Sequence, residues 1–162
     1  MPDTIITNVK VENIRPEYNN LSEWMSNPNN IYIGRKGIVF IDGKRFPQKD
    51  SIWHNPYKIN DKIDRITAIN RYRKFIINKI RSENLMNQLL ELNGKNLGCW
   101  CKPNECHGDV LVELINKYNT YETYDTYETY DKINPQILFD SIDELIKDIE
   151  QMKPIILKKN KN

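Results

Sequence analysis

The segment of residues 97–109, Leu-Gly-Cys-Trp-Cys-Lys-Pro-Asn-Glu-Cys-His-Gly-Asp, constrains the fold more than any other part of the chain. It contains all three cysteines and one of the two histidines of the 162 residues. An apolar approach predicts a buried strand over 95–101, and apolar residues at helical spacing predict a helix over 104–118. Backbone N–H groups and the helix dipole at such a strand-to-helix turn favour anions. We therefore expect the functional site at this turn.

The residues before this segment predict a layered α/β domain. β-branched residues predict strands over 4–11 and 31–35, and 37–43 is typical of a hairpin arm and its turn. Apolar residues three and four apart predict an amphipathic helix over 64–80, followed by a helix over 82–92 that Ser82 caps. Helices and strands in this order indicate a short, mainly parallel sheet flanked by helices. Ligands of such sheets bind at the carboxyl ends of the strands.

Composition divides the chain into three parts. Residues 1–118 form the α/β domain, and residues 119–134 form a low-complexity linker in which the unit TYETYD is written twice. Residues 135–162 are expected to form a C-terminal amphipathic helix and a solvated basic tail. Because the repeat has no apolar periodicity, we expect that it can be deleted without loss of the fold.

Hydropathy and cysteine usage bear on the compartment. Hydrophobic residues make up 39% of the chain, and no apolar run approaches the roughly 18 residues that a membrane-spanning helix needs. The polar start is unlike a signal peptide. Three clustered cysteines do not resemble the even, dispersed cysteines of a secreted disulfide framework. These features predict a cytoplasmic, reducing compartment and no membrane partner.

The charge is concentrated in one stretch. The whole chain has a net charge of +2, but residues 35–81 contain 13 Lys and Arg against 4 Asp and Glu. Such a stretch forms either an ordinary solvated face or a surface that attracts nucleotides or nucleic acid. The frequent Asn, Ile, Lys and Tyr are also typical of an AT-rich genome, which raises the lysine count independently of binding.

The alternation of side chains along a strand bears on the first two cysteines. Cys99 and Cys101 are two residues apart, so both side chains point to one face of the strand while Trp100 points to the other. Asn104 is a good N-cap, which would place Cys106 in the first helical turn. A thiol at that position tends toward a lowered pKa.

Three residues of the turn are candidates for catalysis, namely Cys106, His107 and Asp109. The imidazole of His107 could orient the Cys106 thiol or act as an acid or base near neutral pH. Asp109 could hold the imidazole tautomer, or it could be a favourable carboxylate of the first helical turn. Lys102 adds a nearby cation, and we group it with Cys99 and Cys101 as a candidate ligand-binding residue.

Zinc is the second interpretation of the turn, and buried packing residues are the third. Cysteine and histidine suit zinc, but the C-x-C-x4-C-H spacing differs from paired C-x2-C motifs. Adjacent side chains on one helix also diverge by about 100°. We therefore predict that the four side chains do not form one zinc site. They are Cys99, Cys101, Cys106 and His107.

Three residues from earlier in the chain are further candidates for ligand binding. Arg35 follows a predicted strand and could clamp a phosphate, although a single arginine can also form a surface ion pair. Trp53 could stack on a base or belong to the core, and Asn55 lies in the same loop. His54 is expected to be a surface or loop histidine. We expect Arg35, Trp53 and Asn55 to lie near the start of the 104–118 helix.

Together these residues resemble DUF4326, a family with a domain of unknown function found in bacteria and viruses. The resemblance covers about residues 30–118, and the cysteine motif is its most specific part. His54 departs from the family pattern, which usually has glycine there. Similarity to another family, in which a strand ending in Cys precedes a Cys-His helix start, implies a Rossmann-like three-layer layout. The matching positions are Gly34, Arg35, Trp53, Asn55, Pro56, Tyr57, Tyr72, Cys99, Trp100, Cys101, Pro103, Cys106, His107, Gly108 and Asp109.

We therefore predict a domain that binds a nucleotide or another phosphate-bearing small molecule at the cysteine turn. Enzymatic modification of this ligand at the same turn is the extended form of the hypothesis. The alternative is a nucleic-acid or protein interaction module with a structural or zinc-bound cysteine cluster. Salt dependence separates the two, because affinity for nucleic acid falls steeply with salt. The resemblance to DUF4326 implies no particular reaction, and the sequence identifies no cofactor.

Overall fold

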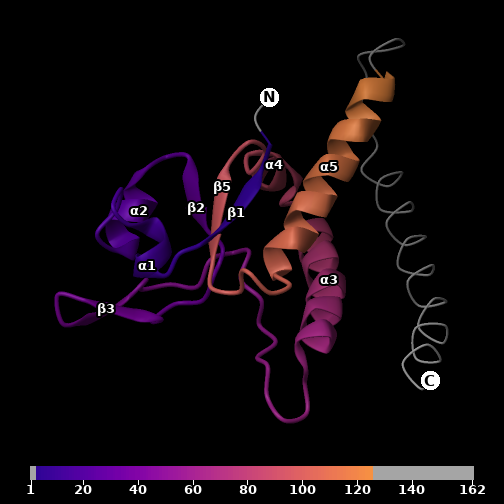
Figure 1. Ribbon diagram of the computed structural model, residues 1–162. Helices are drawn as coiled ribbons and strands as arrows, with labels where there is room; N and C mark the ends of the chain where they lie inside the picture. Colours follow the sequence, from indigo (N-terminus) through magenta and orange to yellow (C-terminus); the bar gives the residue numbers. More distant parts are fainter. Residues whose placement is uncertain (1–2, 126–162) are drawn as a thin grey trace, which may run out of the picture. The chain divides into compact units, whose positions relative to one another are not determined.

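A parallel sheet of three strands forms the centre of the protein. The structure, a computed structural model, describes residues 3–125, with side chains up to 118. The strands are β1 (Ile5–Asn8), β5 (Asn96–Cys99) and β2 (Asn30–Tyr32), in the order β1-β5-β2 (Figure 1). Asn96 of β5 is paired with Ile5 on one side and Asn30 on the other. The predicted mixed α/β fold with a short parallel sheet is confirmed.

A β-hairpin makes a second, separate sheet. Its antiparallel strands are β3 (Val39–Ile41) and β4 (Lys44–Phe46). Asp42 and Gly43 connect them with φ angles of 50° and 74°. Positive φ at both central residues is typical of the tight hairpin turn that Asp-Gly favours, which confirms the hairpin predicted over 37–43.

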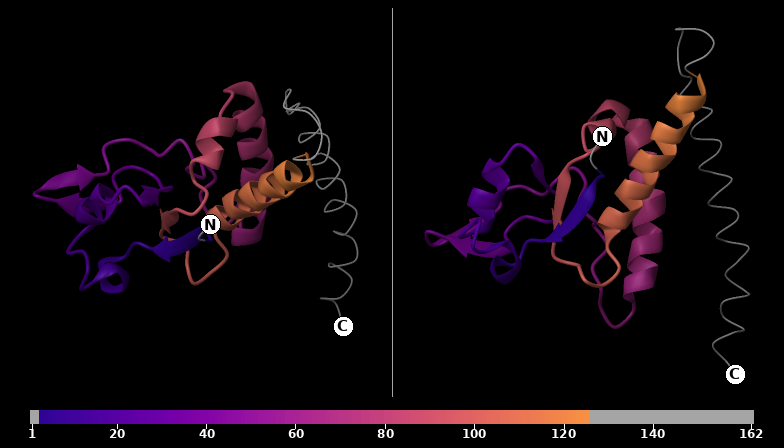
Figure 2. Two further views of the ribbon diagram at one scale, coloured as in Figure 1. Left: turned by 90° about the horizontal axis from the view of Figure 1, so that it is seen from above. Right: turned by 45° about the horizontal axis from the view of Figure 1, so that its top comes forward.

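Helices lie on both sides of the parallel sheet (Figures 1 and 2). Two short helices, α1 (Val11–Ile14) and α2 (Leu21–Ser26), lie on one side. On the other side, α3 (Arg65–Ser82) lies beside the first part of α5 (His107–Asp125). The Arg73 guanidinium of α3 forms a two-pronged ion pair with the Glu113 carboxylate of α5 at 2.7 and 2.8 Å.

The helix predicted over 64–80 is confirmed as α3. The Asp64 carboxylate accepts a hydrogen bond from the Thr67 N–H at 2.6 Å, so Asp64 caps the helix. The helix predicted over 82–92 is shorter and forms α4 (Met86–Leu90). The expectation that Ser82 caps it is wrong, because Ser82 is the last residue of α3. Asn84, with φ of 52°, separates α4 from α3, and a left-handed residue cannot continue a helix.

The last helix begins later than the sequence predicts. The expected N-cap at Asn104 is wrong, because α5 begins at His107 and Cys106 stands directly before it. The Cys106 N–H donates to the Asp109 carboxylate at 3.0 Å, and the Cys106 sulfur accepts from the Gly108 N–H at 3.3 Å. These two bonds satisfy N–H groups that a helix start leaves without partners.

At its other end α5 continues to Asp125, so residues 119–125, expected in the linker, are helical. The rest of the expected linker and the expected C-terminal helix over 135–162 lie outside the described residues. The chain divides into two units, residues 1–117 and 118–162, and the site described below lies in the first. Within residues 3–125, the structure contains no helix long and apolar enough to span a membrane.

The two faces of β5 meet different neighbours. A Cβ atom on Gly98 would lie 2.5 Å from the Trp24 ring of α2, so only glycine allows α2 to pack this closely. Trp100 packs on that same side against a cluster of buried residues. Cys99, between them, faces the side of α3 and α5, where it meets His107. The cluster on the α2 side consists of Val9, Ile14, Leu21, Trp24 and Tyr32.

Candidate functional site

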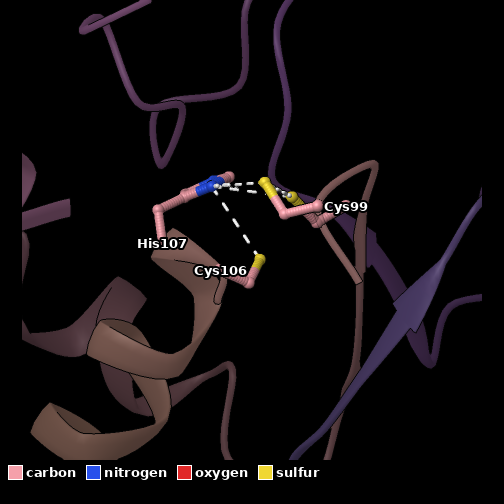
Figure 3. A group of neighbouring side chains, drawn as sticks. Cys99, Cys106 and His107 are labelled. Atoms are coloured by element: carbon pink, nitrogen blue, oxygen red, sulfur yellow. Dashed lines mark hydrogen bonds between the residues drawn. The ribbon is translucent and has the colours of Figure 1, made fainter. Parts of the chain in front are cut away.

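The three cysteines and His107 converge on one point at the end of β5 (Figure 3). Cys99 is the last residue of β5, and its sulfur lies 3.2 Å from the Cys101 sulfur. The His107 Nδ1 atom lies 3.5, 3.9 and 4.0 Å from the sulfurs of Cys99, Cys101 and Cys106. The four potential ligand atoms all lie within 4.8 Å of one another. The prediction that Cys99 and Cys101 share a face is confirmed.

The expectation that Cys106 and His107 point apart is wrong. It assumed that both residues lie within one helix, where neighbouring side chains diverge. Cys106 precedes the helix instead, and its side chain turns back toward the helix start and the other sulfurs. The argument that diverging side chains exclude a shared metal site at these residues therefore fails.

The imidazole of His107 is held in place from its other nitrogen. Nε2 lies 2.9 Å from the carbonyl oxygen of Ile33, the residue after β2, so Nε2 carries the proton and donates it to this bond. Nδ1, the other ring nitrogen, faces the sulfurs. The Tyr72 ring meets the imidazole edge-on with centroids 5.0 Å apart. Because His107 is only 5% exposed, the Ile33 carbonyl and the Tyr72 ring hold its imidazole in a buried position.

Asp109 does not orient the imidazole. One carboxylate oxygen accepts from the Cys106 N–H, and the other forms a 2.7 Å ion pair with the Lys102 ammonium. Asp109 is thus the favourable first-turn carboxylate that the sequence offered as its alternative role. Lys102 is bound to Asp109 and does not line the cavity described below.

The thiols differ in their tendency to ionise. Hydrogen bonds from the Cys106 and Cys99 thiols lower the pKa of Cys101 far below its ordinary value. The same bonds, together with burial, raise the pKa of Cys106. The expectation of a lowered pKa at Cys106 is therefore wrong. The thiol is 1% exposed and acts as a donor, so the anion is favoured at the half-buried Cys101 instead.

The same cluster changes the pKa of His107. Burial disfavours the imidazolium, but hydrogen bonds to the Cys101 and Cys99 sulfurs outweigh burial and raise the pKa of His107 to about 10.

A cavity of about 490 Å³ opens beside the cysteines. Cys99, Cys101 and His107 line one part of it, and the turn after β2, the loop before α3 and the start of α3 line the rest. Most of the lining is apolar, with three cations and one carboxylate. The other lining residues are Gly34, Arg35, Ile38, Asn55, Tyr57, Lys58, Ile59, Arg65, Ala68, Ile69, Trp100 and Glu105.

The cavity brings together some of the predicted site residues and leaves out others. Arg35 and Asn55 line it beside His107, as expected from their predicted position near the helix start. Trp53 belongs to the core at 3% exposure and does not line the cavity, which excludes it as a stacking platform there. Cys106 and Asp109 do not line it either. The catalytic role of Cys106, His107 and Asp109 stays a prediction, and of the three only His107 borders the cavity.

Arg35 connects two segments that are far apart in sequence. Its Nε donates to the Asn55 carbonyl at 2.7 Å, and its Nη2 donates to the Tyr57 carbonyl at 2.9 Å. Arg35 is thus bonded to backbone carbonyls, and the surface ion pair considered for it is not seen among the described residues. Beyond it, Tyr32 accepts from the Trp100 indole N–H, and burial raises the pKa of the Tyr32 hydroxyl to about 12. The Tyr32 hydroxyl also donates to the Arg35 carbonyl at 2.9 Å, so Tyr32 links the turn after β2 to Trp100, the residue after β5.

Sequence reasoning missed several lining residues. Tyr57 enters the sequence analysis only as part of the family motif, and Arg65, the first residue of α3, only as one cation of a basic stretch. Glu105 and Trp100 lie in the cysteine segment, but the direction of their side chains depends on how α5 begins. Charge could have pointed to Lys58 and Arg65, since both lie in the basic stretch 35–81.

Comparison with known proteins identifies the family to which the chain belongs. Residues 17–117 match the family described as domain of unknown function DUF4326. The chain belongs to the DUF4326 family. The matched range contains β2 to β5 and the described cluster and cavity, so this site is part of the DUF4326 domain. In this member of DUF4326, His54 is a loop histidine as expected, with Nδ1 2.7 Å from the Ser51 carbonyl oxygen.

Two viral proteins are similar to this DUF4326 chain. An uncharacterized 12.4 kDa protein in the nrdA-td intergenic region of Enterobacteria phage T4 is 37% identical over 70 residues. That match spans 43% of this chain and 64% of the phage protein, less than two thirds of its length. An uncharacterized protein of Acanthamoeba polyphaga mimivirus is 34% identical over 99 residues, 54% of this chain and 70% of the relative. No solved structure matches the chain.

Proposed function

We propose that the DUF4326 domain of this chain binds a small phosphate-bearing molecule, such as a nucleotide, in the cavity beside the cysteines. The observation that carries the proposal is the charge of the lining. Arg35, Lys58 and Arg65 line the cavity against a single carboxylate, that of Glu105. Three cations against one carboxylate favour an anionic ligand, and phosphate is one of the anions that arginine binds with two parallel hydrogen bonds.

The size and remaining lining of the cavity fit a nucleotide. Its volume of about 490 Å³ lies within the range of about 300–1,000 Å³ typical of small-molecule sites. Tyr57 and Trp100 contribute aromatic surface to the wall. Apolar and aromatic walls bury the uncharged part of a ligand, while a few polar groups fix its orientation.

Arg35 supports the proposal through its geometry. A guanidinium has five N–H donors, and two hydrogen bonds to the carbonyls of Asn55 and Tyr57 hold this one in place. The remaining donors can bind phosphate without a large loss of side-chain freedom, because the group is already fixed. Arg65 is held in a similar way, with Nη1 3.3 Å from the Glu105 carbonyl oxygen.

The position of the cavity in the fold also supports ligand binding. Gly34 and Arg35 follow β2, and Cys99 ends β5, so both strands direct their carboxyl ends to the cavity. In the Rossmann-like three-layer arrangement that we propose for the domain, ligands bind at this edge of the sheet. Here the cavity collects residues from β2, the loop before α3, and the turn after β5.

The test is binding of nucleoside mono-, di- and triphosphates and of inorganic phosphate, measured by calorimetry. At least one nucleotide should bind with an affinity that changes little between low and moderate salt. Lys58→Ala and Arg65→Ala should each weaken it, whereas Lys62→Ala, an exposed residue outside the cavity, should not.

Two outcomes would overturn the proposal. One is that no phosphate compound binds at all. The other is that oligonucleotides bind instead, with an affinity that falls steeply with salt, which would favour a nucleic-acid interaction through the basic stretch 35–81.

A further inference from the structure

We propose that Cys99, Cys101, Cys106 and His107 bind one zinc ion in tetrahedral coordination. This inference concerns a metal site and does not depend on the ligand proposed for the cavity. Thiolates and an imidazole nitrogen are the donors that zinc prefers, and three cysteines with one histidine are a common set for a structural zinc site. The convergence of the four donor atoms within 4.8 Å is the first observation that supports it.

The spacing of the donor atoms fits a single ion. Around a zinc ion with Zn–S of about 2.3 Å and Zn–N of about 2.0–2.1 Å, the corners of a tetrahedron are roughly 3.5–3.8 Å apart. The His107 Nδ1 atom lies 3.5, 3.9 and 4.0 Å from the three sulfurs. The Cys99 and Cys101 sulfurs, at 3.2 Å, need to separate slightly to admit the ion.

The surroundings of His107 are the second, independent observation. A histidine that binds a metal through one nitrogen almost always donates its other N–H to a carbonyl or carboxylate, which fixes the tautomer. His107 does this through Nε2, which lies 2.9 Å from the Ile33 carbonyl oxygen. Nδ1, which faces the sulfurs, is then the nitrogen left to bind the ion.

Hydrogen bonding and charge around the cluster also suit a metal thiolate centre. Three thiolates and a neutral imidazole give a zinc centre with a net charge of −1. The Cys106 sulfur already accepts the Gly108 N–H at 3.3 Å. The start of α5 and the Lys102 ammonium, bound to Asp109 beside it, supply positive potential for that charge.

Burial indicates a structural ion. Cys99, Cys106 and His107 are 2%, 1% and 5% exposed, and only Cys101 is half-buried. Four protein donors complete a tetrahedron, whereas catalytic zinc sites keep one position for water or substrate. The ion would tie the end of β5 to the start of α5 and, through His107, to Ile33 after β2. It would thus hold one wall of the cavity.

The experiment uses the full chain, purified under reducing, oxygen-free conditions. Native mass spectrometry and elemental analysis should find one zinc ion per chain. Replacement by Co²⁺ should give the intense visible bands of tetrahedral cobalt and a thiolate-to-cobalt charge-transfer band in the near ultraviolet. A chelator that removes the zinc should lower the thermal midpoint, and added Zn²⁺ should restore it.

Variants identify the donors. His107→Gln and Cys101→Ser should each weaken zinc binding by more than about 100-fold, because loss of an outer-shell partner alone costs about 10–100-fold. His54→Gln is the matched control, since it removes the other histidine of the chain and lies outside the cluster. It should keep one zinc ion and the cobalt spectrum.

Several results would overturn the site. These are a reduced wild-type chain that stays metal-free with added Zn²⁺, a bound cobalt with the weak bands of octahedral coordination, or equal zinc affinity in His107→Gln and wild type. A wild-type mass two hydrogens lower, with no metal, would show a disulfide within the cluster instead. If a variant does not fold, the wild-type cobalt spectrum still decides. Nucleotide binding is measured separately on zinc-loaded wild type, so either proposal can fail alone.

Discussion

The hydroxyl of Tyr72 donates a 2.8 Å hydrogen bond to the carbonyl oxygen of Trp53. This bond joins the buried face of α3 to the loop that also contains Asn55, and both partners are almost fully buried. Tyr72 also meets the His107 ring edge-on. One side chain of α3 therefore positions both the loop beside the cavity and the imidazole of the cysteine cluster.

Replacing Tyr72 with phenylalanine tests this connection. The ring and its contact with His107 stay, but the buried Trp53 carbonyl loses its partner, which should lower the free energy of unfolding by about 1–3 kcal/mol. Denaturant titration measures the change. Tyr57→Phe, at a half-buried tyrosine of the same loop, is the control and should cost less. Equal effects of the two variants would show that the Tyr72 bond has no special importance.

Asp64 should make stability depend on pH at the start of α3. Hydrogen bonds from Thr67 lower the pKa of Asp64 below its usual 3.8. Its contribution to stability is therefore complete above 3.8 and disappears as the pH falls through the lower folded-state pKa. Asp64→Ala should lower the thermal midpoint at neutral pH, and its difference from wild type should shrink in acid.

Asp64→Asn separates charge from hydrogen bonding at the same position. Asparagine keeps an oxygen that can accept the Thr67 N–H and does not titrate, so most of the stability at neutral pH should remain. Thermal melts of wild type and both variants across the acidic range provide the comparison. A difference between wild type and Asp64→Ala that stays constant down to low pH would contradict the role of the carboxylate.

Gly98→Ala should destabilise the domain by about 1–3 kcal/mol, the usual cost of overpacking. The new Cβ atom would lie 2.5 Å from the Trp24 ring and 2.7 Å from the Val9 side chain. Equilibrium unfolding in denaturant measures the loss. Combining Gly98→Ala with Trp24→Phe should cost less than the sum of the single changes, since the smaller ring makes room. Strict additivity would show that Trp24 is not the obstacle.

Deletion of the two TYETYD copies, with Asn119 joined to Lys132, should leave the fold of the first unit intact. Leu114 and Ile115 of α5, which precede the repeat, belong to the core of this unit. Neither copy has an apolar face to offset the entropy of ordering it. The thermal midpoint should stay within a few degrees. Loss of soluble expression would show that the repeat stabilises the domain.

Local rules were enough to predict much of the fold. Apolar residues at helical spacing over 64–80 identified α3, and Asp42-Gly43 identified the hairpin turn. Two-residue periodicity placed Cys99 and Cys101 on one face. Each of these features depends on backbone preferences within a few residues, which a sequence displays directly.

The cysteine cluster could be located but not arranged from sequence. A shift of the helix start from 104 to 107 decides whether the Cys106 side chain diverges from His107 or joins it. That start depends on the Asp109 carboxylate, which accepts the Cys106 N–H as well as an ion pair from Lys102. Helix boundaries are the least predictable part of a helix, because caps compete on small energy differences.

Tertiary contacts decided the remaining differences. Trp53 is buried because the loop turns its ring into the core, while Tyr72 of α3 binds its carbonyl. Arg35 lines the cavity because carbonyls 20 and 22 residues later in the chain hold its guanidinium. Contacts of this kind join distant segments, and no local pattern in a single sequence encodes them.

The order of the strands has a consequence for synthesis of the chain. The central strand β5 is the last of the three to be made, and it pairs Asn96 with Ile5, 91 positions earlier. While residues 1–95 leave the ribosome, β1 and β2 lack the neighbour that the parallel sheet gives them. Contacts this distant in sequence form slowly. The nascent domain therefore exposes two unpaired strands until translation has passed the segment that also carries the cysteines.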